Sequence, residues 1–225
     1  MAARLHIQGG AKPGAVSREG MYTKMSEYTV IADVGETLIR LLRNNMSDLV
    51  NPDSIVLLSP ADVEGQNTRL TVFLYSVLEN SYLKNREVIQ EDPDHLRYPP
   101  LTVDLHYMLT TYASAQIPDL TERTLEEHRI LGRAMRVLYD NAIIRGSVLQ
   151  GNLAGGDEEF RITLETLSLE ELNKIWTSFP NSHYHPSVGY LVTPVTIESS
   201  RVTDTKRVIT RKTQYYLKEM GKLIK

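Results

Sequence analysis

Two short groups of polar residues have the types and spacing that chemistry would need. The first is in the segment "YPPLTVDLHYMLTTY", residues 98–112, where Asp104 and His106 lie two residues apart. In an extended chain such residues point to the same side of the strand. An aspartate beside a histidine can orient an imidazole for proton transfer, but catalysis would also need a nucleophile or a metal ion close by. We expect instead a polar strand face that contacts solvent or another protein chain.

The second group is the histidine pair His183 and His185 in "NSHYHPS". Two imidazoles at this spacing in an extended chain point the same way, as two ligands of one zinc ion would. A zinc site needs further ligands, and the chain has no cysteine to supply one. A metal-dependent hydrolase that uses His183, His185 and Asp104 is one alternative, whereas a solvated loop is the simpler interpretation.

The glycine-rich segment "GNLAGG", residues 151–156, could suggest a phosphate-binding loop. It lacks the Lys-Ser or Lys-Thr pair that follows the glycines of such loops, and no helix begins there at the required spacing. We therefore expect a hairpin or an interface loop.

The C-terminal segment interleaves aromatic and basic residues, which is one signature of nucleic-acid contact. Residues 206–225 carry a formal charge of +6 and residues 26–205 one of −12, so most of the chain would repel a nucleic acid. Its β-branched and tyrosine side chains also suit a strand that adds to the sheet of another subunit. We favour an assembly arm, and a nucleic-acid-binding module is the second alternative. The residues that we assign to a contact surface are Asp104, His106, Lys206, Arg207, Arg211, Lys212, Tyr215 and Tyr216.

The composition is typical of one soluble domain with extended ends. With 225 residues, of which 41% are hydrophobic, the chain can bury about 70% of its unfolded surface in one core. We expect a flexible leader at 1–27, one domain at 28–200 and the basic arm at 201–225. The lack of cysteine excludes disulfides and thiolate-bound clusters. No window approaches the roughly 18 apolar residues of a membrane span. These features favour assembly in the cytoplasm.

Apolar periodicity and capping residues predict three helices. The first covers roughly residues 30–48, where apolar residues recur at helical spacing. Thr124 and Glu127 form a candidate capping box that would begin a helix at 124–141. A second capping box, Ser168 with Glu171, would begin a helix at 168–178.

Alternating patterns predict a sheet between and beside these helices. The segment 69–80 has apolar residues on both faces, which is typical of a central strand, so we expect a charge at Phe73 to unfold the chain. Pro194 cannot donate a ladder hydrogen bond, which places its strand at an edge or at a bulge. The expected strands are 54–59, 69–80, 101–111, 160–167 and 187–197.

Six segments, taken in order and spacing, resemble one protein family. They are "DVGETLIRLLRNN", "LTVFLYSVLENSYLKNRE", "YPPLTVDLHYMLTTYA", "EHRILGRAMRVLYDN", "ITLETLSLEELNKIW" and "YHPSVGYLVTPVTIES". Together they are similar to the domain found in tail-terminator or cap proteins of extracellular contractile injection systems, over about residues 28–200. The resemblance implies a non-enzymatic structural protein with the fold of phage tail terminators. It also implies a homohexameric ring that ends the inner tube and anchors the last sheath layer of the particle.

These observations together predict an α+β domain with a twisted, mainly antiparallel sheet flanked by helices. The expected partners are further copies of the chain, an inner tube protein and a sheath protein. We expect no catalytic residue, cofactor, metal ion, nucleic acid or membrane partner. The hydrolase and the nucleic-acid-binding module stay open as the two alternatives.

Overall fold

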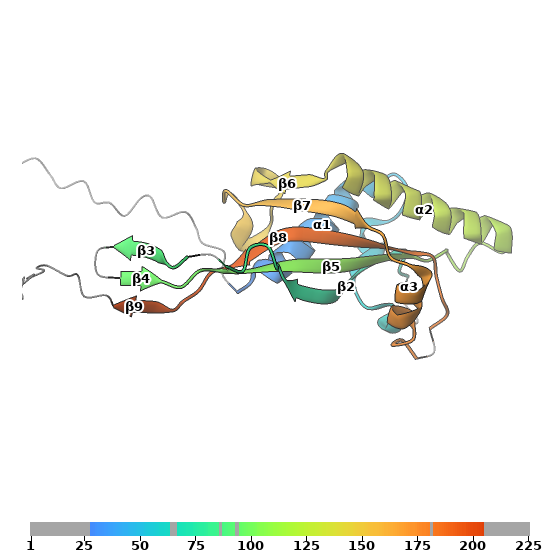
Figure 1. Ribbon diagram of the computed structural model, residues 1–225. Helices are drawn as coiled ribbons and strands as arrows, with labels where there is room; N and C mark the ends of the chain where they lie inside the picture. Colours follow the sequence, from blue (N-terminus) through green and yellow to red (C-terminus); the bar gives the residue numbers. More distant parts are fainter. Residues whose placement is uncertain (1–27, 64–66, 86, 93–94, 181, 205–225) are drawn as a thin grey trace, which may run out of the picture.

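The protein is built on one curled sheet of six strands, described by a computed structural model (Figure 1). The structure describes residues 28–63, 67–85, 87–92, 95–180 and 182–204. The strand order in the sheet is β1-β2-β5-β8-β7-β6, in which only β1 and β2 are parallel. The strands are β1 (Ile55–Leu57), β2 (Leu70–Glu79), β5 (Leu101–Thr111), β6 (Ile143–Arg145), β7 (Glu159–Glu165) and β8 (Ser187–Ile197).

Two long helices cover one face of this sheet. They are α1 (Val30–Met46) and α2 (Leu120–Asp140). The apolar side of α1 includes Val30, Leu38 and Leu42, which are buried against core residues of β5 such as Leu105 and Tyr107. Such a stripe at helical spacing opposite alternate residues of strands forms one continuous core. No described helix is both long and apolar enough to cross a membrane.

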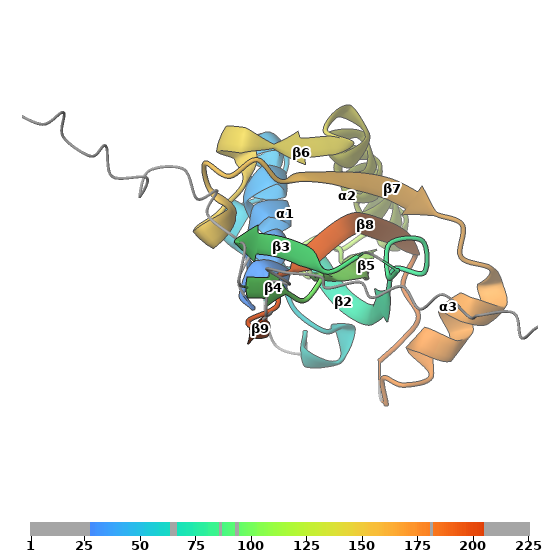
Figure 2. The ribbon, with the colours of Figure 1, turned by 60° about the vertical axis from the view of Figure 1, so that its left-hand side comes forward.

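A short helix, α3 (Leu169–Trp176), covers part of the other face. Trp176 and Phe179 pack there against Met108 of β5, and Phe73 of β2 lies beside them. The Phe179 ring meets both Phe73 and Trp176 edge-on, with centroids 5.6 Å apart in each pair. α3 lies across the large sheet from α1 (Figure 2). The domain therefore has a second, smaller apolar cluster on that face.

Three short strands form a separate antiparallel sheet, which we call the ribbon: β3 (Ile89–Asp92), β4 (His95–Arg97) and β9 (Val202–Asp204), in the order β3-β4-β9. β4 runs on into β5, and β8 runs on into β9, so the central strands of the large sheet lead directly into the ribbon. The ribbon extends from one end of the body (Figure 1). At its base the Arg201 guanidinium lies 3.9 Å from the ring centroid of Tyr98.

The structure confirms the expected α+β class and most of the elements. The helix expected at 30–48 is α1, and the helix expected at 168–178 is α3, which begins with the capping box of Ser168 and Glu171. The five expected strands correspond to β1, β2, β5, β7 and β8.

The expected start of the second helix is wrong. α2 begins at Leu120, because the side chain of Asp119 accepts a hydrogen bond from the backbone N–H of Glu122 at 2.8 Å. Thr124 lies inside the helix and donates to the Leu120 carbonyl oxygen at 3.0 Å. Glu127 does not cap the helix and instead accepts from a backbone N–H of the preceding loop. An N-cap aspartate therefore begins the helix one turn earlier than the capping-box pattern indicated.

The sheet positions expected for two strands also need correction. The centre of the sheet is β5 and β8, whereas β2 is covered by β1 only at Leu70–Val72 and becomes exposed from Val77 onward. β8 is not an edge strand, since it pairs with both β5 and β7. Pro194 does lie at a bulge, because the β5–β8 register shifts between Val103 and Leu105. At the bulge the backbone of residue 194 does not need to donate a hydrogen bond to β5. Proline, which has no backbone N–H, therefore fits inside this central strand.

Candidate assembly surfaces

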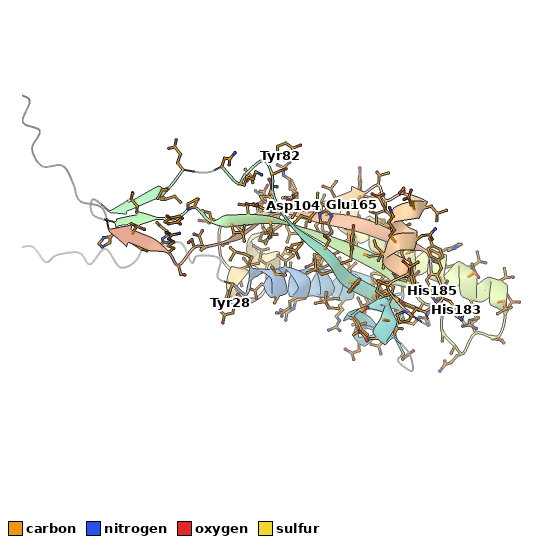
Figure 3. The ribbon with its side chains drawn as sticks, turned by 60° about the horizontal axis from the view of Figure 1, so that its bottom comes forward. Tyr28, Tyr82, Asp104, Glu165, His183 and His185 are labelled. Atoms are coloured by element: carbon orange, nitrogen blue, oxygen red, sulfur yellow. The ribbon has the colours of Figure 1, made fainter. Side chains whose placement is uncertain are left out.

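Asp104 holds together three segments at the ribbon end of the large sheet. Its carboxylate accepts hydrogen bonds from the Asn80 amide nitrogen, at 2.9 Å, and from the Thr193 hydroxyl. The amide oxygen of Asn80 in turn accepts from the backbone N–H groups of Tyr82 and Leu83, at 3.0 and 3.1 Å. Asp104 therefore fixes the turn that follows β2 (Figure 3).

His106 joins a different polar group on the same face of β5. Its Nδ1 lies 2.9 and 3.1 Å from the two carboxylate oxygens of Glu165, on β7. The Tyr75 hydroxyl donates to the same carboxylate at 2.8 Å. Burial raises the pKa of Tyr75, and the hydrogen bond and charge of Glu165 raise it further. The group links three strands, and among the described residues no hydrogen bond joins His106 to Asp104.

The face that carries Asp104 and His106 is not uniformly exposed, contrary to the polar outer face that we expected. Met108 is buried beneath α3, and Thr110 is buried with its hydroxyl 2.8 Å from that of Ser187. Both Asp104 and His106 are partly buried. Their assignment as contacts to another chain stays a prediction.

His183 and His185 lie at the opposite end of β5 from Asp104 (Figure 3). The ring centroids of His185 and Tyr112 are 4.7 Å apart. The Nδ1 of His185 lies 3.7 Å from a carboxylate oxygen of Glu127. Desolvation lowers the pKa of His185. Asp104 precedes Tyr112 by eight residues of extended chain, about 26 Å at 3.3 Å per residue. The three proposed hydrolase residues therefore do not meet, and within the described ranges no three carboxylate or imidazole side chains gather as metal ligands.

The glycine-rich loop packs against the N-terminal half of α1. Gly151 has a backbone φ of +61°, and an added Cβ would collide with the Asp33 carboxylate. The Asn152 amide donates to the Thr29 hydroxyl at 3.1 Å, and Leu153 is buried. Gly151 is needed for its positive φ and its lack of a side chain. A glycine in this loop is therefore explained without a bound phosphate.

The basic arm lies almost wholly outside the described residues. Strand β9 belongs to the segment that we assigned to the arm, and its pairing with β4 places residues 202–204 in the ribbon. The other arm residues chosen as contacts are beyond the part of the chain that the structure describes: Lys206, Arg207, Arg211, Lys212, Tyr215 and Tyr216.

Exposed apolar side chains gather at two places that sequence patterns did not reveal. The first is the ribbon and its junction with the body, where Tyr82 is 93% exposed. The second lies between the end of α2 and β7, where Tyr139 and Leu164 border the same hollow. Large exposed apolar patches usually mark contacts with other proteins. The first group is Val77, Leu78, Tyr82, Val88, Ile89, Leu101 and Val202, and the second is Tyr139 and Leu164.

Comparison with protein families gives a match over most of the chain. The sequence model of the Pvc16 N-terminal domain family matches residues 33–211. The chain belongs to this family. The matched range begins in the first turn of α1 and extends past β9, so it includes both described sheets, α2, α3 and most of α1. A search of curated proteins found no match.

Two solved structures share the fold of this Pvc16 N-terminal domain. One is the sheath/tube terminator of an extracellular contractile injection system, PVC, in its extended state, with 19% identity and a TM-score of 0.55 over 88% of this chain. The other is the tube-terminating cap of the anti-feeding prophage, with 17% identity and a TM-score of 0.53 over 82% of this chain. The present chain spans 66% and 61% of the lengths of those two chains.

Proposed function

We propose that this protein is the structural terminator of a contractile injection particle. It would close the inner tube and anchor the last sheath layer. The observation that carries this proposal is the family match over residues 33–211, supported by a fold shared with a sheath/tube terminator and a tube-terminating cap. As the resemblance to tail terminators implies, we place the chain in a homohexameric ring.

The distribution of polar and apolar groups supports a structural role. Asp104 and His106 are bonded to Asn80 and Glu165 within the chain, where they hold strands and turns in register. The exposed apolar residues lie instead at the ribbon and on the α2 side. A subunit that contacts ring neighbours, a tube and a sheath needs several such surfaces.

The basic arm is the part of the chain that we assign to docking. Its charge of +6 contrasts with the −12 of residues 26–205, so it would guide the approach of an acidic neighbour. Strand addition to a neighbouring cap or sheath subunit would then fix the register. β9, near the start of the arm, pairs with β4 in the ribbon.

Deletion of this protein from a particle-producing strain tests the proposal. We expect inner tubes of uncontrolled length and sheaths that detach at one end, both seen by electron microscopy. Re-expression of the full chain should restore uniform tubes. A strain that makes particles of normal length with firmly attached sheaths in the absence of the protein would contradict the terminator function.

A further inference from the structure

We infer that a hollow beside α3 binds an extended, proline-containing segment of a partner protein. We call this hollow the α3 pocket. Its volume is about 430 Å³. It lies at the end of the body away from the ribbon, where two of its lining residues, His183 and His185, are labelled in Figure 3. The inference goes beyond the terminator function and does not depend on the proposed ring.

The walls of the α3 pocket consist mostly of rings. They come from the short helix η2 (Pro60–Asp62), from the residue after β5 and from the segment between α3 and β8. The His185 ring centroid lies 4.7 Å from that of Tyr112 and 6.1 Å from that of Trp176. The ring of Tyr184, which is 51% exposed, lies 5.5 Å from Trp176 and extends this aromatic surface. The lining residues that carry a ring are Pro60, Tyr112, Trp176, Pro180, His183 and His185.

One hydrogen-bond donor of the α3 pocket has no partner within the described part of the chain. Trp176 is 7% exposed, and its indole Nε1–H makes no hydrogen bond there. A buried tryptophan N–H usually has an acceptor, because the group loses its bond to water when it is buried. Since Trp176 lines the pocket, we assign the missing acceptor to a ligand held in it.

The charge around the α3 pocket favours a neutral acceptor over a carboxylate. The Nδ1 of His185 lies 3.7 Å from the carboxylate of Glu127, which would repel a second carboxylate. Desolvation lowers the pKa of His185, so its imidazole carries no charge near pH 7 to attract an anion. A backbone carbonyl oxygen is a neutral acceptor and meets both conditions.

An extended segment with proline offers such a carbonyl in the most suitable form. Carbonyl groups in helices and sheets are already bonded within their own element, whereas a polyproline II segment has no internal hydrogen bonds and leaves its carbonyls free. Its proline rings pack on aromatic side chains, and its stiff backbone loses little entropy on binding. The unpaired Trp176 N–H and the rings around it are therefore complementary to this class of ligand.

Binding of a blocked polyproline peptide to the full-length protein tests the inference. Isothermal titration calorimetry should show saturable binding. The emission of Trp176, the only tryptophan, should change with the same dissociation constant, because the peptide would contact its ring. A blocked glycine-serine peptide of the same length is the control and should neither bind nor change the emission.

Two variants separate the hydrogen bond from the shape of the pocket. Trp176→Phe keeps a ring but removes the N–H, and it should weaken binding of the polyproline peptide about tenfold in calorimetry. Ala61→Phe enlarges an exposed lining residue and should abolish saturable binding by filling the pocket. Ala154→Phe changes an exposed alanine of the glycine-rich loop and is the matched control, with natural binding expected.

Three results would overturn the inference. The first is no saturable binding of the polyproline peptide to the natural protein. The second is binding that Ala61→Phe leaves unchanged, which would place the peptide elsewhere. The third is tighter binding of a blocked glutamate-rich peptide, which would show that the ligand is an anion. None of these results concerns tube length, so the deletion strain tests the terminator function separately.

Discussion

The substitution Phe73→Asp tests how the two apolar clusters depend on each other. Phe73 is partly buried on the α3 face of β2, with its ring centroid 5.6 Å from that of Phe179. The sequence alone indicated unfolding of the whole chain, since β2 looked like a central strand. The structure instead places Phe73 outside the main core, so we expect α3 to detach while the α1 and α2 side stays folded.

The loss of stability in Phe73→Asp can be estimated from the contacts of the Phe73 ring. Full burial of a phenylalanine side chain contributes about 1.5–3 kcal/mol, so a half-buried ring contributes about 1 kcal/mol. The edge-on contact with Phe179 adds roughly 0.5–1.5 kcal/mol. A carboxylate beside Met108 adds a desolvation penalty of roughly 1 kcal/mol. The total is about 3 kcal/mol. A helix of eight residues is unstable by itself in water, so α3 depends on this packing and we expect it to detach.

The assay uses Trp176, which is the only tryptophan, lies on α3 and is 7% exposed. In Phe73→Asp its fluorescence should shift to the red, while far-UV circular dichroism should keep most of its helical signal. Tyr82→Asp changes a 93% exposed ring and is the control, with natural emission expected. Unchanged Trp176 emission in Phe73→Asp would show that α3 does not depend on Phe73. Complete loss of the helical signal would show that the α1 and α2 side does not stay folded without it.

Three further predictions concern local interactions and the arm. Asn80→Ala should lower the free energy of unfolding by about 2 kcal/mol, because the buried Asn80 amide bonds both the Asp104 carboxylate and two backbone N–H groups. The control Asn85→Ala changes an exposed residue and should shift the urea midpoint little. Equal shifts in the two variants would contradict this prediction. Ser168→Ala should cost about 1 kcal/mol through loss of the N-cap, measured by urea titration. The hydrogen bonds from Ser168 hold the pKa of Glu171 below its usual value. The stability that they give is therefore present above the unfolded-state pKa and lost as pH falls through the lowered one, and a Ser168→Ala deficit that persisted unchanged at acidic pH would contradict this. Deleting residues 206–225 should leave a folded body that binds tube or sheath ends less well, with the largest loss at low salt; unfolding of the truncated chain, or natural binding at all salt concentrations, would refute it.

Local signals were sufficient for the elements whose partners lie close in sequence. α1 follows from apolar residues at helical spacing, and α3 follows from the Ser168 and Glu171 capping box, which needs only a span of three residues. The eleven residues of β8 follow from alternation, and Pro194 marks its bulge. In each case the signal lies within the element itself, either as a repeating apolar pattern or as a pair of residues three apart. The local sequence is therefore enough to predict the element.

Long-range pairings could not be predicted in the same way. His106 finds Glu165 at a separation of 59 residues, and Asp104 finds Thr193 at 89 residues. Which carboxylate meets which strand depends on register across the sheet, and register is not encoded locally. The ribbon was missed because its segment, "EDPDHLRYPP", is polar and rich in proline, and its strands have only three or four residues.

The most direct test of the terminator function is a cryo-electron microscopy reconstruction of the intact particle's end. We expect six copies of this chain in one layer, on the last ring of the inner tube and in contact with the last sheath layer. The described parts of residues 28–204 should fit the density of each copy. Density for the chain along the length of the tube, or its absence from the particle end, would contradict the terminator function.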